Sequence, residues 1–224
     1  MRAHFGGSSR KSLVASRVSL DAAVKGADAN SASALSSELF FVADVLSTNI
    51  AVRRALTDPS RDGKAKAAFI SELFGKKVGA VALGLVTELS SLRWSSPKDL
   101  VLVVEQLAIE AEASAANIAG ELDRVEDEIF TAATAFASSS ELRKALTSDA
   151  TNAKATLVAD ILKGASGSTV KLVSQMVNAW RGRSIESAFA DYQWALAARR
   201  NRVIALVRVA TPITQAQLDR LTAT

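Results

Sequence analysis

The stretch that decides the fold is residues 97–137, PKDLVLVVEQLAIEAEASAANIAGELDRVEDEIFTAATAFA. It contains no proline after its first residue, and Gly120 is its only glycine. Apolar residues recur every three or four positions throughout, which is the spacing of a helix with a buried face. The stretch therefore predicts one continuous helix of roughly 60 Å, at about 1.5 Å per residue.

Helical periodicity continues on both sides of this stretch. Further helices are expected over residues 8–25, 31–56, 64–74 and 78–92 before it, and over 140–146, 152–163, 169–180 and 184–199 after it. Alanine supplies many of the apolar residues, and aromatic residues make up only 5% of the chain, which is typical of closely packed helices. Three prolines and eleven glycines are too few turn residues for an all-β fold of 224 residues.

An internal repeat relates the two sides of the long stretch. Residues 52–57, VRRALT, resemble residues 142–147, LRKALT, and lie 90 positions before them. The same offset pairs Glu38-Leu39-Phe40 with Glu128-Ile129-Phe130 and Lys64-Ala65 with Lys154-Ala155. A period near 90 is too long for a solenoid repeat of roughly 20 to 50 residues. The repeat therefore predicts two consecutive helical bundles, residues 8–112 and 113–200, that share the long helix.

The character of the sequence changes after residue 200. Residues 202–210, RVIALVRVA, are rich in β-branched side chains and precede Thr211-Pro212, which predicts a strand. Thr214, with Gln217 three residues on, predicts the cap of a short helix. A lone strand leaves its backbone groups unpaired. The complete fold prediction is therefore an all-α chain of two bundles, followed over residues 201–224 by one strand and a short helix that begin a truncated α/β domain.

The residues that catalysis requires are scarce. The chain has no cysteine, and its single histidine, His4, lies near the N-terminus, which excludes a Ser-His-Asp arrangement and most zinc sites. Residues 164–169, GASGST, lack the Gly-Lys-Ser/Thr ending of a phosphate-binding loop and are interpreted as a turn between helices. We therefore expect no catalytic, cofactor-binding or metal-binding residue, and a protein that is not an enzyme.

Charge is spread evenly along the chain. The net charge of +4 divides equally, because residues 1–112 and 113–224 each carry two more basic than acidic residues. The densest basic cluster, residues 199–202, stands at the end of an expected helix, where cations interact favourably with the helix dipole. Contact with RNA or another phosphate is the alternative interpretation. The acidic run over residues 121–128 is interpreted as a solvated helix face. We therefore expect no nucleic-acid partner.

The chain has no obvious membrane segment. Its N-terminus lacks the apolar stretch of a signal peptide, and its longest apolar runs are far shorter than the roughly 20 residues of a membrane helix. We expect no direct insertion into a membrane.

Four sequence features together resemble one protein family. Residues 207–217, VRVATPITQAQ, follow a pattern in which a strand is followed by a small residue, proline, an apolar residue, threonine and glutamine. Gly182-Arg183 precedes the helix expected over 184–199, and Ala15-Ser16-Arg17 and Arg93-Trp94-Ser95 lie further upstream. In order and spacing these features resemble the delta subunit of F-type ATP synthase, the family of the oligomycin-sensitivity-conferring protein. The extra helical repeat is similar to its actinobacterial branch.

The resemblance, which spans about residues 8–221, implies a stator role. A delta subunit links the catalytic α3β3 head to subunit b of the peripheral stalk and resists rotary torque during proton-driven ATP synthesis. The resemblance implies as partners the N-terminal helices of the α subunits and subunit b, leaves open a contact with the β subunit, and places the chain peripherally on the cytoplasmic side of the cell membrane. A helical, basic nucleic-acid-binding or regulatory protein is the alternative function.

The family continues past the expected strand into a small α/β domain that is absent after Thr224, which puts the contact with subunit b in doubt for this chain. For the α-subunit contact, we expect an apolar groove between the first helix and the long helix, because both carry apolar residues with small neighbours. The expected partner interface consists of Leu13, Leu20, Val24, Val101, Val104 and Ala108.

Overall fold

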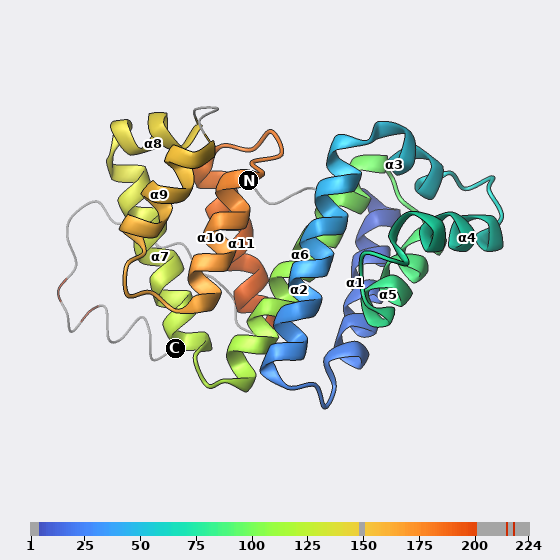
Figure 1. Cartoon of the computed structure of the whole chain (residues 1–224), viewed down its shortest axis with the longest axis horizontal. Helices are drawn as coiled ribbons and strands as arrows, with labels where there is room; N and C mark the ends of the chain where they lie inside the picture. Colours follow the sequence, from blue (N-terminus) through green and yellow to red (C-terminus); the bar gives the residue numbers. More distant parts are fainter. Residues whose placement is uncertain (1–4, 148–150, 201–213, 215–216, 218–224) are drawn as a thin grey trace.

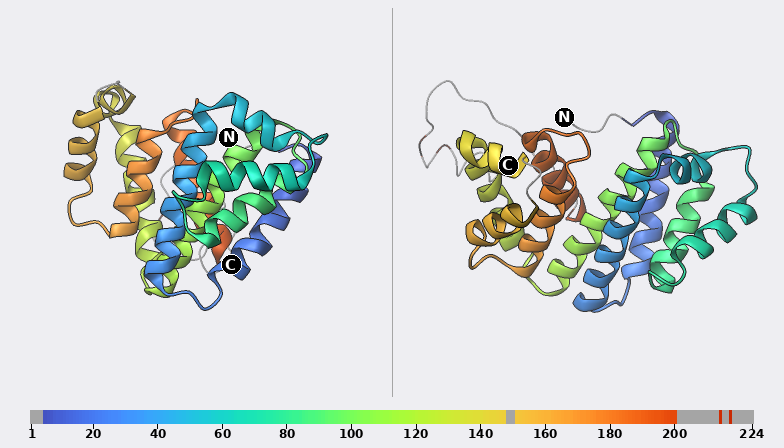
Figure 2. Two further views of the ribbon diagram at one scale, coloured as in Figure 1. Left: turned by 45° about the vertical axis from the view of Figure 1, so that its right-hand side comes forward. Right: turned by 45° about the horizontal axis from the view of Figure 1, so that its top comes forward.

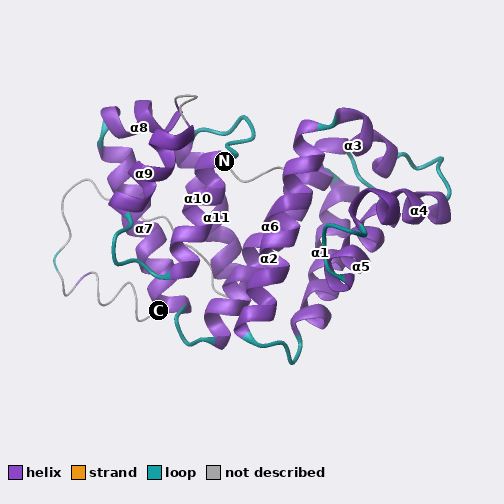
Figure 3. Cartoon of the chain, viewed as in Figure 1, coloured by secondary structure: helices purple, strands orange, loops and turns teal. Residues whose placement is uncertain are grey.

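The computed structural model describes residues 5–147 and 151–200, together with residues 214 and 217. This part of the chain consists of helices and connecting loops (Figures 1 and 3). The helices are α1 (Gly7–Val24), α2 (Ala29–Thr48), α3 (Ile50–Thr57), α4 (Gly63–Phe74), α5 (Ala80–Ser91), α6 (Pro97–Ile118), α7 (Leu122–Ser138), α8 (Ser140–Thr147), α9 (Thr151–Ile161), α10 (Gly167–Asn178) and α11 (Ile185–Arg199).

The fold-class prediction is wrong in one part. It included a β-strand, whereas the residues that the structure describes form eleven helices and no strand, so the class is mainly α. Residues 202–210, where the strand was expected, lie outside the described residues. A strand needs the free edge of another strand to pair its backbone groups, and the described part of the chain offers no such edge. Further on, the Thr214 N–H donates to Gln217 Oε1 at 2.9 Å, the hydrogen bond that the expected helix cap requires.

The long helix expected over residues 97–137 is two helices, α6 and α7. Gly120 ends α6 because it adopts the left-handed conformation, with φ of 73°, which L-residues rarely adopt. The Glu121 N–H then donates to the Ala116 carbonyl at 2.8 Å, and the Gly120 N–H donates to the Asn117 carbonyl at 3.1 Å. These two bonds form a Schellman motif. The glycine therefore lets the chain turn back, and α7 packs against α10 and α11 (Figure 1).

The helix expected over residues 31–56 is also divided. It breaks at Asn49, where α3 turns by 105° from α2. No single helix of the described residues is long and apolar enough to cross a membrane; α2 and α3 meet those criteria only as a bent pair.

The internal repeat is visible in the order of the helices. The series α1 to α5 recurs as α6 to α10, with α3 and α8 starting 90 residues apart and α5 and α10 starting 87 apart. The packing of the helices is repeated as well: α1 contacts α5 and α6, and its equivalent α6 contacts α10 and α11. We call α1–α6 the first bundle and α6–α11 the second bundle. The predicted boundary at residue 112 lies inside α6, which belongs to both bundles.

Helix α6 occupies the centre of the molecule. It packs along most of its length against α2 and also contacts α1 and α3 on one side and α7, α10 and α11 on the other. The two bundles lie side by side around it (Figure 2). Between Leu100 and Ala116 only Leu102 and Gln106 are not fully buried. A helix that is buried on all sides is normally apolar, so the three glutamates in this segment of α6 need a separate explanation.

Candidate functional site

Three carboxylates of α6 are buried at the junction of the two bundles. Glu105, Glu110 and Glu112 are each at most 2% exposed. An unpaired buried carboxylate destabilises a fold by several kcal/mol, so each one requires a cation. The cations come from other elements: Arg17 of α1, Lys171 of α10, and Arg181 and Arg183 of the α10–α11 loop. We call this set of seven residues the ionic seam.

Glu110 ties α1 to α6. Arg17 donates to Glu110 Oε1 through Nη2 at 2.6 Å and through Nε at 2.8 Å. Gln106 Nε2, one turn earlier on α6, donates to the same oxygen at 3.0 Å.

Glu112 ties three helices together. Lys171 Nζ lies 2.6 Å from Glu112 Oε2, and Ser168 Oγ of α10 donates to Oε1 at 2.7 Å. Ser33 Oγ of α2 donates to Glu112 Oε2 at 2.9 Å, and Lys171 Nζ donates to the Ser33 carbonyl at 2.6 Å. The group therefore joins α2 of the first bundle to α10 of the second through α6.

Glu105 receives two guanidinium groups. Arg183 Nη2 lies 2.7 Å and Arg181 Nε lies 3.2 Å from Glu105 Oε1. Each arginine also reaches a second acid: Arg181 Nη2 is 2.7 Å from Asp44 of α2, and Arg183 Nη1 is 3.2 Å from Asp191 of α11. The α10–α11 loop is thereby fastened to α2, α6 and α11 at once.

Burial perturbs the pKa values of the groups beside Glu105. Burial lowers the pKa of the Arg183 guanidinium, but the charge and hydrogen bond of Glu105, together with the charges of Tyr192 and Asp191, outweigh this and the pKa is raised. Burial, followed by the negative charge of Glu105, raises the pKa of the Tyr192 hydroxyl well above its usual range. Burial also raises the pKa of Asp191, against the lowering effect of Arg183. Arg183 therefore stays a cation beside Glu105.

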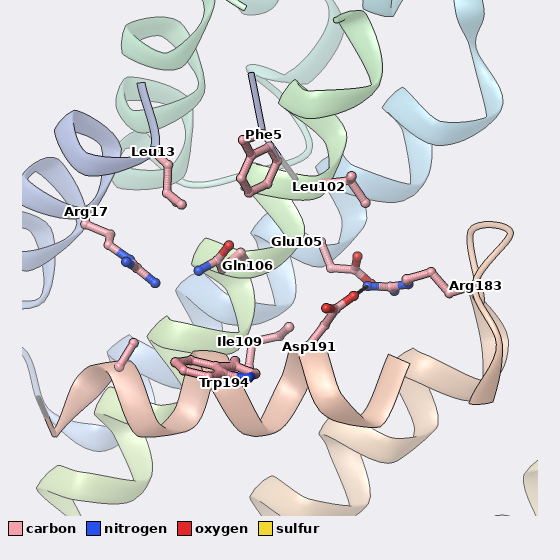
Figure 4. Close-up of a pocket in the computed structure, with 11 residues that line it drawn as sticks. Phe5, Leu13, Arg17, Leu102, Glu105, Gln106, Ile109, Arg183, Asp191 and Trp194 are labelled. Atoms are coloured by element: carbon pink, nitrogen blue, oxygen red, sulfur yellow. Dashed lines mark hydrogen bonds and ion pairs between the residues drawn. The ribbon is translucent and has the colours of Figure 1, made fainter. Parts of the chain in front are cut away.

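A cavity of about 340 Å³ lies beside the seam, between α1, α6 and α11 (Figure 4). Its apolar lining comprises Phe5, Leu13, Leu102, Ile109, Trp194 and Ala198. Its polar lining consists of Arg17, Glu105, Gln106, Arg183 and Asp191. Glu105, Arg183 and Asp191 meet at one end of the cavity, while the Trp194 ring lies along α11 (Figure 4).

The predicted interface residues divide into two groups. Leu20, Val101, Val104 and Ala108 are buried, with exposures of 0 to 4%. Leu13 and Val24 are half-buried, and Leu13 lines the cavity. Because α1 packs directly on α6, a partner helix reaches only the latter two without separating these helices.

The accessible apolar residues of α1 lie on its other face. Val14 and Val18 are 60% and 66% exposed and stand one turn apart, with exposed Ala22 one turn further on. Val81 of the neighbouring helix α5 is 52% exposed, and Ser19 Oγ joins the two helices through a 2.6 Å hydrogen bond to Glu88 of α5. We call Val14, Val18, Ala22 and Val81 the α1–α5 surface. Sequence reasoning missed it, although the spacing of 14, 18 and 22 marks a second apolar stripe on α1.

The basic cluster at the end of α11 makes ion pairs within the chain. Arg199 pairs with Asp21 of α1, and Arg200 pairs with Asp123 and Glu126 of α7. The nucleic-acid alternative thus gains no support from these two arginines. The turn predicted over residues 164–169 is shorter in the structure. Ser166 Oγ caps α10 by accepting the Thr169 N–H at 3.2 Å, and residues 167–169 already belong to that helix.

Within the described ranges, no group of three or more potential ligands is placed to hold a metal ion.

Comparison with known proteins gives one consistent result. The family described as "ATP synthase delta (OSCP) subunit" matches residues 110–224. A protein named ATP synthase subunit delta from Streptomyces coelicolor is 41% identical over 218 residues, covering 96% of this chain and 79% of the relative. Proteins of the same name from Streptomyces avermitilis and Kineococcus radiotolerans are 39% and 38% identical over 224 residues, covering 99% and 97% of this chain and 81% and 80% of the relatives.

Proposed function

The chain belongs to the ATP synthase delta (OSCP) subunit family, and on this premise we propose that it acts as a stator subunit of the F-type ATP synthase. It is a structural subunit and not an enzyme. The observation that carries this function is the similarity to ATP synthase delta subunits over nearly the whole chain. The stator holds the α3β3 head against the torque of the rotor while protons drive ATP synthesis.

Stiffness is the mechanical requirement of a stator, and the described residues supply a source of it. The two bundles share α6, so any bending between them must separate helices that pack on α6. It must also break charged pairs that are buried from water, such as Lys171 with Glu112. Separating such a pair exposes a charge in a poorly solvated place, which costs several kcal/mol. The seam therefore opposes rotation of one bundle against the other.

The partners that we propose are the N-terminal helices of the α subunits and subunit b. For the α subunit we propose the α1–α5 surface, because Val14, Val18 and Ala22 form an exposed apolar stripe on α1 and an amphipathic helix binds through such a stripe. Val14 and Val18 would contact the apolar face of that helix. Leu13 and Val24, on the side facing α6, are the alternative contacts that remain from the six predicted residues.

We further propose a contact with subunit b and a peripheral location at the membrane, both of which membership of the family supports. The chain would then lie at the cytoplasmic side of the cell membrane, held there by its partners.

Binding of the purified F1 head to the isolated chain tests the proposed function. The double variant Val14→Asp, Val18→Asp should weaken binding by about thirtyfold, because two contact residues each contribute roughly 1 kcal/mol. Ile50→Asp is the matched control: it is 54% exposed on α3, away from this surface, and should change the affinity by less than about twofold.

The outcomes separate the stator function from the placement of the site. If the unsubstituted chain bound neither the F1 head nor subunit b, the stator function would be wrong. If the chain bound the head and the double variant bound it equally well, only the α1–α5 surface would be wrong. A loss of binding in Leu13→Asp alone would move the site to the cavity side of α1.

A further inference from the structure

One face of α2 is covered by the second bundle. Near its start, Ser33 receives Lys171 of α10, whose Nζ donates to the Ser33 carbonyl at 2.6 Å. Near its end, Asp44 pairs with Arg181 at 2.7 Å. Phe40 lies seven residues after Ser33 and four before Asp44, so helical geometry places all three on one face. Phe40 is only 1% exposed, and its two polar neighbours on this face of α2 both contact the second bundle.

The repeat offset of 90 places the same face on α7, where it is uncovered. Ser33, Phe40 and Asp44 correspond to Asp123, Phe130 and Thr134. Phe130 is 65% exposed, compared with 1% for Phe40. Exposed Asp127 and Ala137 lie on the same side of α7. We call Asp123, Asp127, Phe130, Thr134 and Ala137 the α7 face. Helix α7 lies at the end of the molecule far from α1–α5 (Figure 1).

Phe130 is not needed for the core of its own bundle. Helix α7 packs on α11 through its opposite side, where Val125, Ile129 and Phe136 are fully buried. Phe136 meets Phe189 of α11 with ring centroids 5.4 Å apart. The equivalent ring in the first bundle, Phe40, is buried. Phe130 is therefore accessible to a partner, and aromatic side chains are enriched among the residues that contribute most to binding.

Charge indicates what kind of partner fits the α7 face. The face is acidic at its start, and Arg200 of α11 already pairs there with Asp123 and Glu126. Position 33 of α2, the equivalent of Asp123, likewise receives a cation, Lys171. A cation therefore occupies this position in both copies. Asp127 lies one turn further along the exposed face, where it can pair with a basic side chain of a partner.

We propose that the α7 face binds a basic amphipathic helix of another subunit, with a lysine or arginine against Asp127 and small apolar residues against Phe130. The template within the chain is the pair of contacts that Lys171 and Arg181 make with Ser33 and Asp44 of α2. This inference rests on the proposed function, since it assigns a second docking surface to the same stator. It is separate from the α1–α5 surface, which lies on the first bundle.

A single cysteine at position 130 tests the proposal directly. The chain has no cysteine, so Phe130→Cys creates one attachment site for benzophenone maleimide. The labelled full-length chain is assembled with the remaining ATP synthase subunits, irradiated, and the attached peptide identified by mass spectrometry. Glu72→Cys, exposed on α4 of the first bundle, is the matched control.

The expected product is one peptide of another subunit, in which a lysine or arginine stands three or four residues from apolar residues at helical spacing. An acidic or non-helical peptide, attachment only to a second copy of the chain, or a yield no higher than that of Glu72→Cys in an assembled complex would overturn the proposal. If the unlabelled chain failed to assemble, the proposed function would be wrong and this inference with it.

Charge reversal provides a second, independent readout. Adding Asp127→Lys to the Phe130→Cys chain should lower the yield of the attached peptide by about tenfold, because it places like charges together at the contact. Adding Glu72→Lys should leave the yield unchanged. Equal yields with Asp127→Lys and Glu72→Lys would show that no basic partner meets this face, and circular dichroism of each variant confirms that its helical content is retained.

Discussion

Val14 and Val104 occupy equivalent positions of the internal repeat, yet one is 60% exposed and the other fully buried. The same is true of Val18 and Ala108, at 66% and 0%. The difference arises because α1 stands at the edge of the molecule, whereas α6 has a bundle on each side. Equivalent helices of a duplicated chain therefore play different parts: one is the centre of the core, and the other keeps an exposed apolar stripe at the edge of the molecule.

The buried polar residues of the two helices differ in the same way. On α1 the buried residues include Ser9, Ser12 and Ser16, small side chains that allow close packing on α6. On α6 the buried residues include three glutamates, which fasten the neighbouring helices by ion pairs. A central helix such as α6 is thus held to its neighbours by buried ion pairs, which fix their orientation, as well as by the burial of apolar side chains.

The difference in burial between α1 and α6 is tested most strongly by placing an aspartate at position 14 or at the equivalent position 104. Val104→Asp buries an unpaired carboxylate among apolar side chains and should lower the free energy of unfolding by about 4 kcal/mol or more. Val14→Asp, on the exposed face, should change it by less than about 0.5 kcal/mol. Urea unfolding followed by circular dichroism measures both. Similar losses at the two positions would show that α1 and α6 are not differently buried.

The contribution of the ionic seam to stability can be measured by removing one of its cations. Lys171→Met leaves Glu112, which is 2% exposed, without its cation and should lower the free energy of unfolding by about 3 kcal/mol. Arg143→Met is the control: it removes a surface ion pair with Glu186 that is half-exposed on both sides, and should cost less than about 0.5 kcal/mol.

The same seam also predicts a rescue. In the double variant Lys171→Met, Glu112→Met, the buried charge is absent and most of the lost stability should return. If the double variant were as unstable as Lys171→Met alone, packing of the Lys171 side chain and not its charge would join the bundles.

The end of α6 marks another difference between the copies. Gly26 and Gly120 both adopt positive φ after the first helix of their copy, but α6 has 22 residues and α1 has 18. Gly120→Ala should lower the free energy of unfolding by about 1 kcal/mol, because alanine is strained at this φ although its Cβ meets no neighbour. Gly84→Ala, within the exposed side of α5, should raise it by about 0.5 to 1 kcal/mol. Thermal unfolding compares the two, and equal signs would contradict the role of Gly120.

Much of the fold could be predicted from the sequence because helical periodicity and the repeat are local patterns. The helix after Ser139, the turn at Ser166 and the period near 90 all follow from residues close together in the chain. Gly120 shows the limit: a lone glycine in a periodic stretch is compatible both with a continuous helix and with a cap. Only the bonds from Gly120 and Glu121 back to α6 distinguish the two.

The candidate site was harder to predict for a physical reason. Leu20 and Val104 have the apolar character of a binding groove, but the same character serves the core, and periodicity does not say which apolar stripe of α1 another helix covers. The ionic seam was also missed, because Glu105 and Arg183 are 78 residues apart and nothing local in the sequence pairs them.

The smallest predicted effect concerns Glu128, which fastens the start of α10 to α7. Burial alone would raise its pKa, but hydrogen bonds from Thr169, Ser166 and Arg124 outweigh this, so the pKa lies below its ordinary value of 4.5. The Ser166 N–H, for example, donates to Glu128 Oε2 at 2.9 Å. A carboxylate whose pKa is lowered on folding stabilises the fold above its unfolded pKa, and this stabilisation is lost as the pH falls through the folded value.

Glu128→Gln should therefore lower the free energy of unfolding at neutral pH by somewhat less than about 1 kcal/mol, and the gap from the unsubstituted chain should narrow as the pH falls below 4.5. Glu38→Gln is the control from the first bundle. Glu38 occupies the equivalent repeat position and accepts the Gly79 N–H, at the start of α5, at 2.9 Å. Because both carboxylates fasten the fifth helix of their copy to the second, both variants should lose stability at pH 7. If only Glu128→Gln lost stability, the hydrogen bond from the second helix to the start of the fifth helix would stabilise the second bundle alone. The two copies would then differ in this contact as well as in the burial of their first helices, α1 and α6.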